Sequence, residues 1–205
     1  MSGIIAQNTL DGSGLIKSPE GGGGWTFIKK LDASSSSDLS FVNGSSDVVL
    51  DSTYKEYIFY LVNIHPETDH VAISFQGSTD TGSNYNTTIT STAFRSYNAE
   101  SSSGYAFYDT STDLAESSSF QIIAREVGGD ADQAASAYLH LFDPSNTTFV
   151  KHFILRSNHI QGNDMSNDEQ VGGYFNTTSA VDAIQFKFSS GNIDAGSIFL
   201  HGLTT

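Results

Sequence analysis

The sequence has no cysteine and few basic residues, and each shortage excludes a class of function. Without cysteine the chain forms no disulfide, no classical zinc finger and no cysteine-bound iron–sulfur cluster. Lysine and arginine total 9 against 23 aspartate and glutamate residues, which gives a formal net charge of -14. Affinity for nucleic acid comes mainly from cations that neutralise phosphates. We therefore expect no nucleic-acid partner and, for the same reason, no anionic membrane.

Signals for export and catalysis are lacking too. Residues 1–5 have neither a basic start nor a long apolar stretch, and no run approaches the roughly 18 apolar residues of a membrane helix. Neither Gly-x-Ser-x-Gly nor the phosphate-binding Gly-x-x-x-x-Gly-Lys occurs. No pair of carboxylates can be named for glycoside hydrolysis. We expect a soluble, non-enzymatic chain without a cofactor, made in the cytoplasm.

A period of two in the apolar residues dominates from Trp25 onward. Val71, Ile73 and Phe75 alternate with polar or small residues, which is typical of a strand with one buried face. Residues 57–64 are apolar on both faces, as in a central strand or one covered by a neighbouring subunit. A short helix fits only residues 130–137. We predict strands at 25–32, 37–42, 54–64, 69–77, 88–97, 104–109, 118–126, 135–142, 147–157, 181–189 and 195–203.

So many short strands, separated by turns every 8–15 residues, predict one antiparallel β-sandwich of jelly-roll type over residues 25–205. Residues 1–24 differ in composition and include four consecutive glycines, Gly21 to Gly24. We interpret them as an arm and a hinge, either a solvated tail or a segment that docks on a neighbour. The apolar residues of the arm are candidate attachment points: Ile4, Ile5, Leu10, Leu15 and Ile16.

Two acidic segments are candidate metal sites. Residues 65–70 hold His65, His70 and two carboxylates, although Pro66 favours a polar hairpin connection over a zinc-binding helix. Residues 162–169 offer oxygen ligands for calcium but lack the spacing of a calcium-binding loop. A solvated loop is the alternative in both cases, and we predict no metal.

The chain is rich in aromatic residues, with 9 Tyr and 14 Phe. Exposed rings can stack on sugars, whereas buried rings belong to the core or to a subunit interface. The tyrosines near predicted loops or strand ends are candidate glycan contacts: Tyr85, Tyr97, Tyr105, Tyr108 and Tyr174.

Several segments together resemble a recurrent β-sandwich domain of tailed-bacteriophage virion proteins, especially those of marine phages. They are Trp25–Ile28, Asp38–Phe41, Asp51–Ile64 and Gly191–Leu203. In that family a Thr-Tyr-x-x-Tyr-x-Phe-x-Leu-x-Asn-Ile strand and a terminal Gly-Ser-Ile-x-Leu-x-Gly strand bracket the domain, and both patterns occur here.

The resemblance implies a structural component of a virion: a capsid decoration protein, a head fibre or a tail accessory protein. Such domains are commonly oligomeric, a trimer being one arrangement, and contact other virion proteins. The negative, polar surface fits this role because it avoids adhesion to DNA and anionic envelopes. A carbohydrate-binding module or receptor-recognition domain for cell-surface glycan is the alternative. A polysaccharide depolymerase is a third hypothesis, for which 205 residues is short.

Overall fold

The computed structural model describes residues 24–100 and 104–203, and all regular secondary structure in these ranges is β-strand. All pairs of strands are antiparallel. The described residues form no helix that could span a membrane. The strands are β1 (Trp25–Asp32), β2 (Leu39–Val42), β3 (Glu56–Pro66), β4 (Val71–Ser78), β5 (Ile89–Ala99), β6 (Tyr105–Tyr108), β7 (Gln121–Val127), β8 (Ala135–Phe142), β9 (Lys151–Gln161), β10 (Met165–Phe175), β11 (Ala183–Phe188) and β12 (Ile193–Leu203).

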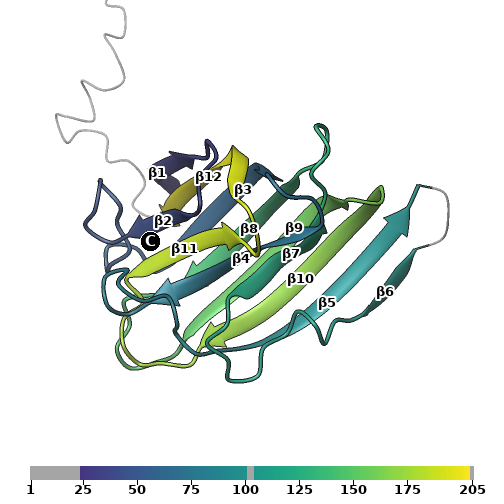
Figure 1. Cartoon of the computed structure of the whole chain (residues 1–205). Helices are drawn as coiled ribbons and strands as arrows, with labels where there is room; N and C mark the ends of the chain where they lie inside the picture. The colour runs from purple at the N-terminus through teal and green to yellow at the C-terminus, as the bar shows by residue number, and fades with distance from the viewer. Residues whose placement is uncertain (1–23, 101–103, 204–205) are drawn as a thin grey trace, which may run out of the picture.

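The strands lie in two layers (Figure 1). The order β1-β12-β3-β8-β9-β10-β5-β6 makes a large sheet, and β2-β11-β4-β7 makes a small sheet in front of it. One residue pair, Val127 with Gln161, joins β7 to β9 and makes the hydrogen-bonded path continuous. The predicted all-β class is therefore confirmed. The strand order is compatible with a jelly roll that has an extra hairpin, β8–β9, beside β10.

Aromatic rings fill the space between the layers. Phe75 of β4 lies edge-on to Phe153 of β9, with ring centroids 5.2 Å apart. Phe186 of β11 packs against Phe59 of β3, with ring centroids 5.4 Å apart. These rings are at most 1% exposed, and burial of such side chains is the main favourable term in folding.

Two predictions about the chain between residues 130 and 175 are wrong. The residues expected to form a short helix, 130–137, form a turn that leads into β8. The acidic segment 162–169 is mostly not a loop, because β10 begins at Met165. The sequence predicts no strand there, because the inward positions Asn167 and Glu169 are polar and interrupt the apolar alternation.

Other boundaries agree to within a few residues, and β1 begins at Trp25 as predicted. Residues 1–23 of the predicted arm, which include all its candidate attachment residues, lie outside the described residues. The attachment role of the arm therefore stays a prediction.

Candidate binding surface

The large sheet has one face against the core and one face open. Along β9, buried and exposed residues alternate without interruption from Lys151 to Gln161, as a strand between core and solvent requires. The open face, here called the outer face, presents several large apolar side chains. Phe94 is 57% exposed, Ile154 52% and Tyr138 37%.

Strand register aligns the outer-face rings in one row across the sheet. Tyr60 pairs with Tyr138, and Tyr138 pairs with Arg156. Arg156 pairs in turn with Gln170, and Gln170 pairs with Phe94. Tyr108 ends the row, where its ring lies edge-on to Phe94 with centroids 5.4 Å apart.

Between Tyr138 and Phe94 the outer face is hollowed. One depression of about 320 Å³ is lined by both rings and by Gly172, and a second of about 120 Å³ shares Phe94 with it. A third of about 570 Å³ shares Ser96 with the second. We call this connected hollow over β8, β9, β10, β5 and β6 the outer trough.

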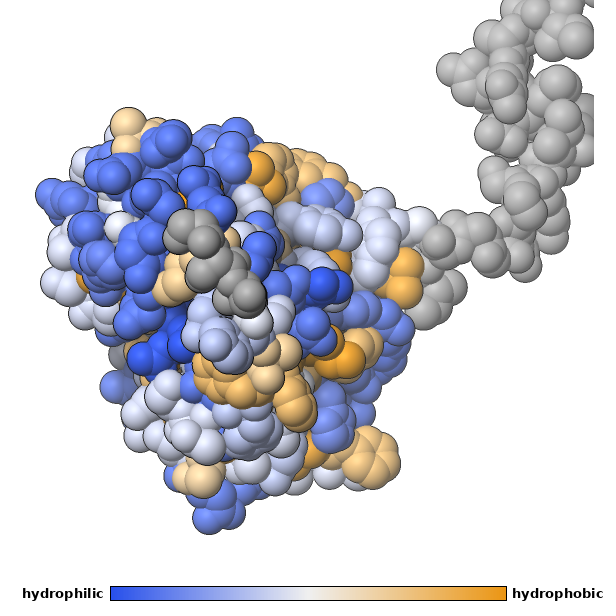
Figure 2. All heavy atoms as spheres, turned by 90° about the vertical axis from the view of Figure 1, so that its right-hand side faces the viewer, coloured by the Kyte–Doolittle hydropathy of each residue, from blue (hydrophilic) through white to orange (hydrophobic). Residues whose placement is uncertain are grey.

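Gly172 leaves the floor of the trough open. A Cβ atom built at this position meets no other heavy atom within 4 Å. In Figure 2, which faces the end of the molecule where β5 and β6 lie, hydrophobic side chains form patches among hydrophilic ones.

Polar side chains with fixed orientations occupy the middle of the trough. Arg156 and Asp168 form a bidentate ion pair, in which Nη2 of Arg156 donates to Oδ2 of Asp168 at 2.6 Å and Nε donates to Oδ1 at 3.0 Å. Asp168 raises the pKa of Arg156, so this guanidinium stays charged. Asn158 donates to the backbone oxygen of Asn167 at 2.8 Å, and Gln170 makes a longer contact, from Nε2 to Oδ1 of Asp168 at 3.4 Å. The trough therefore combines apolar rings with oriented donors and acceptors.

The predicted glycan tyrosines do not form one site. Tyr108 lies in the outer-face row, and Tyr174 contacts His152 farther along the outer face, with ring centroids 5.9 Å apart. Tyr97 and Tyr105 come together at 5.7 Å on the opposite face of the β5–β6 hairpin, and both also line the third depression of the trough. Tyr85 lies apart in a loop, where burial raises its pKa.

The sequence does not single out the main residues that line the first depression: Phe94, Tyr138, Arg156, Gln170 and Gly172. Period-two alternation could have placed Phe94 on one face of its strand. No local signal could have placed it in one row with Tyr138, because strand pairing decides that.

The candidate metal ligands are not brought together. His65 Nδ1 lies 3.6 Å from Asp194 Oδ2, whereas His70 Nε2 lies 3.7 Å from Asp69 Oδ2. Within residues 24–100 and 104–203 there is no group of three or more His, Cys, Asp or Glu side chains that could hold a metal ion. In the acidic segment, Glu169 points into the core and Asp168 is paired with Arg156.

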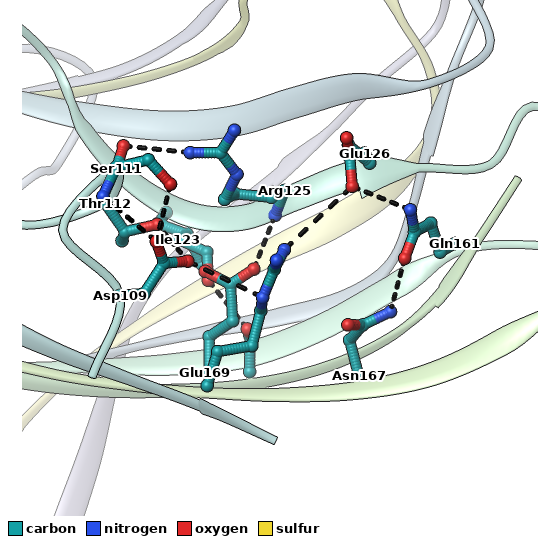
Figure 3. A network of polar contacts seen from close by, with 11 residues as sticks. Asp109, Ser111, Thr112, Ile123, Arg125, Glu126, Gln161, Asn167 and Glu169 are labelled. Carbon is teal, nitrogen blue, oxygen red and sulfur yellow. Dashed lines mark hydrogen bonds and ion pairs between the residues drawn. The ribbon is translucent and has the colours of Figure 1, made fainter. Parts of the chain in front are cut away.

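Behind the trough, the inner face of the same strands has a buried polar cluster (Figure 3). Glu169 pairs in register with Arg95 on one side and Ser157 on the other, and Asn167 with His159 forms the next row. Each of these side chains except Arg95 is about 1% exposed. This arrangement is unusual because burial of an ionisable group is costly.

The cluster supplies hydrogen-bond partners for the free edge of β7. Beyond its pairing with β4, β7 has one residue pair with β9, so several of its backbone groups have no strand partner. Glu169 Oε1 accepts a hydrogen bond from the backbone N–H of Arg125 at 2.9 Å. Ser157 donates from Oγ to the backbone oxygen of Ile123 at 2.6 Å. Side chains of the large sheet thus satisfy buried backbone groups of the small sheet.

Burial also shifts two pKa values in the cluster. It raises the pKa of Glu169 to about 7 and lowers the pKa of His159 to about 4. A carboxyl group with such a pKa is a candidate acid or base. Both side chains are only 1% exposed, however, so neither meets a ligand from solvent. The cluster therefore serves the fold, and the outer trough is the candidate binding surface.

No family model, curated protein or solved structure matches this chain.

Proposed function

We propose that the chain is a non-enzymatic, exposed component of a tailed-phage virion that binds a neutral glycan in its outer trough. The proposal rests on one observation, an open trough in which aromatic rings flank oriented hydrogen-bonding groups. A sugar ring has an apolar face that stacks on an aromatic side chain and hydroxyl groups that bond to polar ones. Tyr138 and Phe94 provide the first kind of contact, and Gln170 the second.

The dimensions of the trough favour an oligosaccharide over a single sugar. Tyr138 on β8 and Phe94 on β5 are separated by three strand spacings of about 4.8 Å each, roughly 14 Å in total. Two rings at that separation can contact different units of one glycan chain.

Charge favours a neutral glycan. The chain has a formal net charge of -14, which repels acidic polysaccharides. The cation in the middle of the trough, Arg156, is already neutralised by Asp168. It can donate a hydrogen bond to a hydroxyl group, but it offers no unpaired positive charge to a carboxylate or sulfate.

The virion part of the proposal is supported by the sequence resemblance, which implies a capsid decoration, head fibre or tail accessory role. In this role residues 1–24 anchor the domain to other virion proteins. Deletion of residues 1–23 should leave a folded sandwich that no longer enters particles. Normal incorporation of the truncated chain would contradict anchoring by the arm.

Native gels that contain soluble polysaccharides test glycan binding directly. We expect a neutral bacterial polysaccharide to retard the full-length chain. Phe94→Ala and Tyr138→Ala should each weaken binding at least tenfold, because each removes a stacking ring. Phe149→Ala is the matched control, since Phe149 is 69% exposed but lies outside the trough.

Two results would contradict the proposal. One is retardation that Phe94→Ala and Tyr138→Ala leave unchanged. The other is absence of binding to every neutral polysaccharide in a panel that includes surface glycans of several bacteria.

A further inference from the structure

Among the described strands the two sheets have four edge strands, and two of these, β1 and β7, have features that protect an edge against pairing with another chain. β1 has a bulge between Phe27 and Lys29 and two lysines, which are common protective features of an edge. The free edge of β7 is occupied by side chains of the buried polar cluster. β2 has four residues, as β6 does, but its alternate residues Leu39 and Phe41 are buried.

β6 is as short as β2 but has none of the protective features of β1 and β7. Its sequence is Tyr-Ala-Phe-Tyr, without lysine or proline and without a bulge in its pairing with β5. All four of its residues are exposed, with Tyr105 at 66%. In Figure 1 it lies at the free side of the large sheet, and it pairs only with β5 among the described strands.

The direction of the backbone groups of β6 follows from one hydrogen bond. Asp109 N–H donates to the backbone oxygen of Ala93 at 2.9 Å, so residue 109 is a hydrogen-bonded position opposite β5. Such positions alternate along an antiparallel pair. Phe107 and Tyr105 therefore direct their backbone groups toward β5, whereas Ala106 and Tyr108 direct theirs away from it.

We propose that β6 pairs in antiparallel fashion with β6 of a second copy of this chain, extending the large sheet across a two-fold axis. An antiparallel pair of identical strands is self-complementary, as a two-fold interface requires. The strand itself is uncharged, so it contributes no like-charge pair at the contact even though each chain has a formal net charge of -14.

The register places Ala106 opposite Ala106 of the second copy. Ala106 directs its backbone N–H and C=O outward, so it can form a hydrogen-bonded pair with its symmetry mate. This register keeps the paired residues within 104–108. The turn that starts at Asp109, where Thr112 N–H donates to its backbone oxygen, stays outside the interface.

Single-cysteine variants test this register because the chain has no cysteine of its own. The Cα atoms of a hydrogen-bonded antiparallel pair lie about 5.5 Å apart, within the range of roughly 4.4–6.8 Å that a disulfide spans. Oxidation of Ala106→Cys should therefore give a covalent dimer. Ser190→Cys, which places an exposed thiol in the β11–β12 turn, should stay monomeric at the same concentration.

Two further variants test the non-covalent dimer by sedimentation equilibrium of the full-length chain. Ala106→Pro removes an N–H that faces away from β5, and Ala106→Lys sets like charges opposite each other. Both should weaken the dimer at least tenfold and leave the circular dichroism spectrum unchanged.

A chain that stays monomeric up to millimolar concentration would overturn the proposal. So would a dimer that both variants leave intact, or Ser190→Cys dimers that form as readily as Ala106→Cys dimers. These measurements use no glycan, so their outcome is separate from that of the binding proposal.

Discussion

The inner and outer faces of β10 are built from different residues. On the inner face, Asn167, Glu169 and Val171 are at most 2% exposed and contact the core or the edge of β7. On the outer face, Gln170 is exposed and Gly172 has no neighbour for a Cβ atom. The inner face thus holds the two sheets together, whereas the outer face contributes little to the fold and is available for binding.

The largest expected effect is on the inner face of β9. Phe153→Ala removes a ring that packs against Phe75 and Phe175, and it should lower the free energy of unfolding by about 3–5 kcal/mol. Its neighbour Ile154 lies on the outer face and is 52% exposed. Ile154→Ala should change stability by less than about 0.5 kcal/mol. Urea unfolding of both variants measures the difference, and equal losses would contradict the distinction between the faces.

The buried polar cluster should make stability depend on pH. The pKa of Glu169 is about 7 in the folded chain against an ordinary value of 4.5. Between pH 4.5 and pH 7, Glu169 is deprotonated in the unfolded chain but still protonated in the folded chain, so stability falls as pH rises. At about 1.4 kcal/mol per pKa unit the fall is roughly 3 kcal/mol. Glu169→Gln should abolish it, as urea unfolding from pH 4 to 8 would measure.

His159 should act with the opposite sign. Its pKa is about 4 in the folded chain against an ordinary value of 6.5. As pH falls through this range, the unfolded chain takes up a proton that the folded chain does not, and roughly 3 kcal/mol of stability is lost. His159→Gln should remove that loss, so the two variants should show opposite slopes between pH 4.5 and 6.5. Parallel slopes would be inconsistent with burial of both groups.

Two adjacent glycines of β10, Gly172 and Gly173, should differ in how much stability an added methyl group costs. A Cβ atom at Gly173 would lie 2.6 Å from Cζ of Phe153 and 2.7 Å from the backbone oxygen of Thr90. Gly173→Ala should therefore cost about 1–3 kcal/mol through overpacking. Gly172→Ala should be neutral or slightly stabilising, because glycine weakens a strand interior. Thermal unfolding of both variants tests this, and the comparison fails if Gly172→Ala costs as much as Gly173→Ala.

The smallest effect is expected for the ion pair in the trough. Arg156 is largely exposed beside Asp168, and exposed pairs contribute about 0.2–1 kcal/mol. A double-mutant cycle with Arg156→Ala and Asp168→Ala would measure their coupling. A coupling well above this range would mean that the outer face also stabilises the fold.

More of the fold than of the outer trough could be predicted from the sequence. Alternation of apolar residues predicted most strands, because it depends on neighbours in the sequence. It failed at β10, where Asn167 and Glu169 are buried polar residues that bond to the edge of another strand or to their own segment. The trough could not be predicted, since Phe94 and Tyr138 come from β5 and β8 and are aligned only through β9 and β10.

The most direct test of the central claim fills the trough from its floor. Gly172→Leu places a side chain where a Cβ atom meets no neighbour, so the chain should fold with unchanged stability. If the outer trough binds a glycan, this variant should lose at least tenfold in affinity for the polysaccharide that retards the unmodified chain. Unchanged affinity in a stably folded Gly172→Leu variant would contradict the assignment of binding to the outer face.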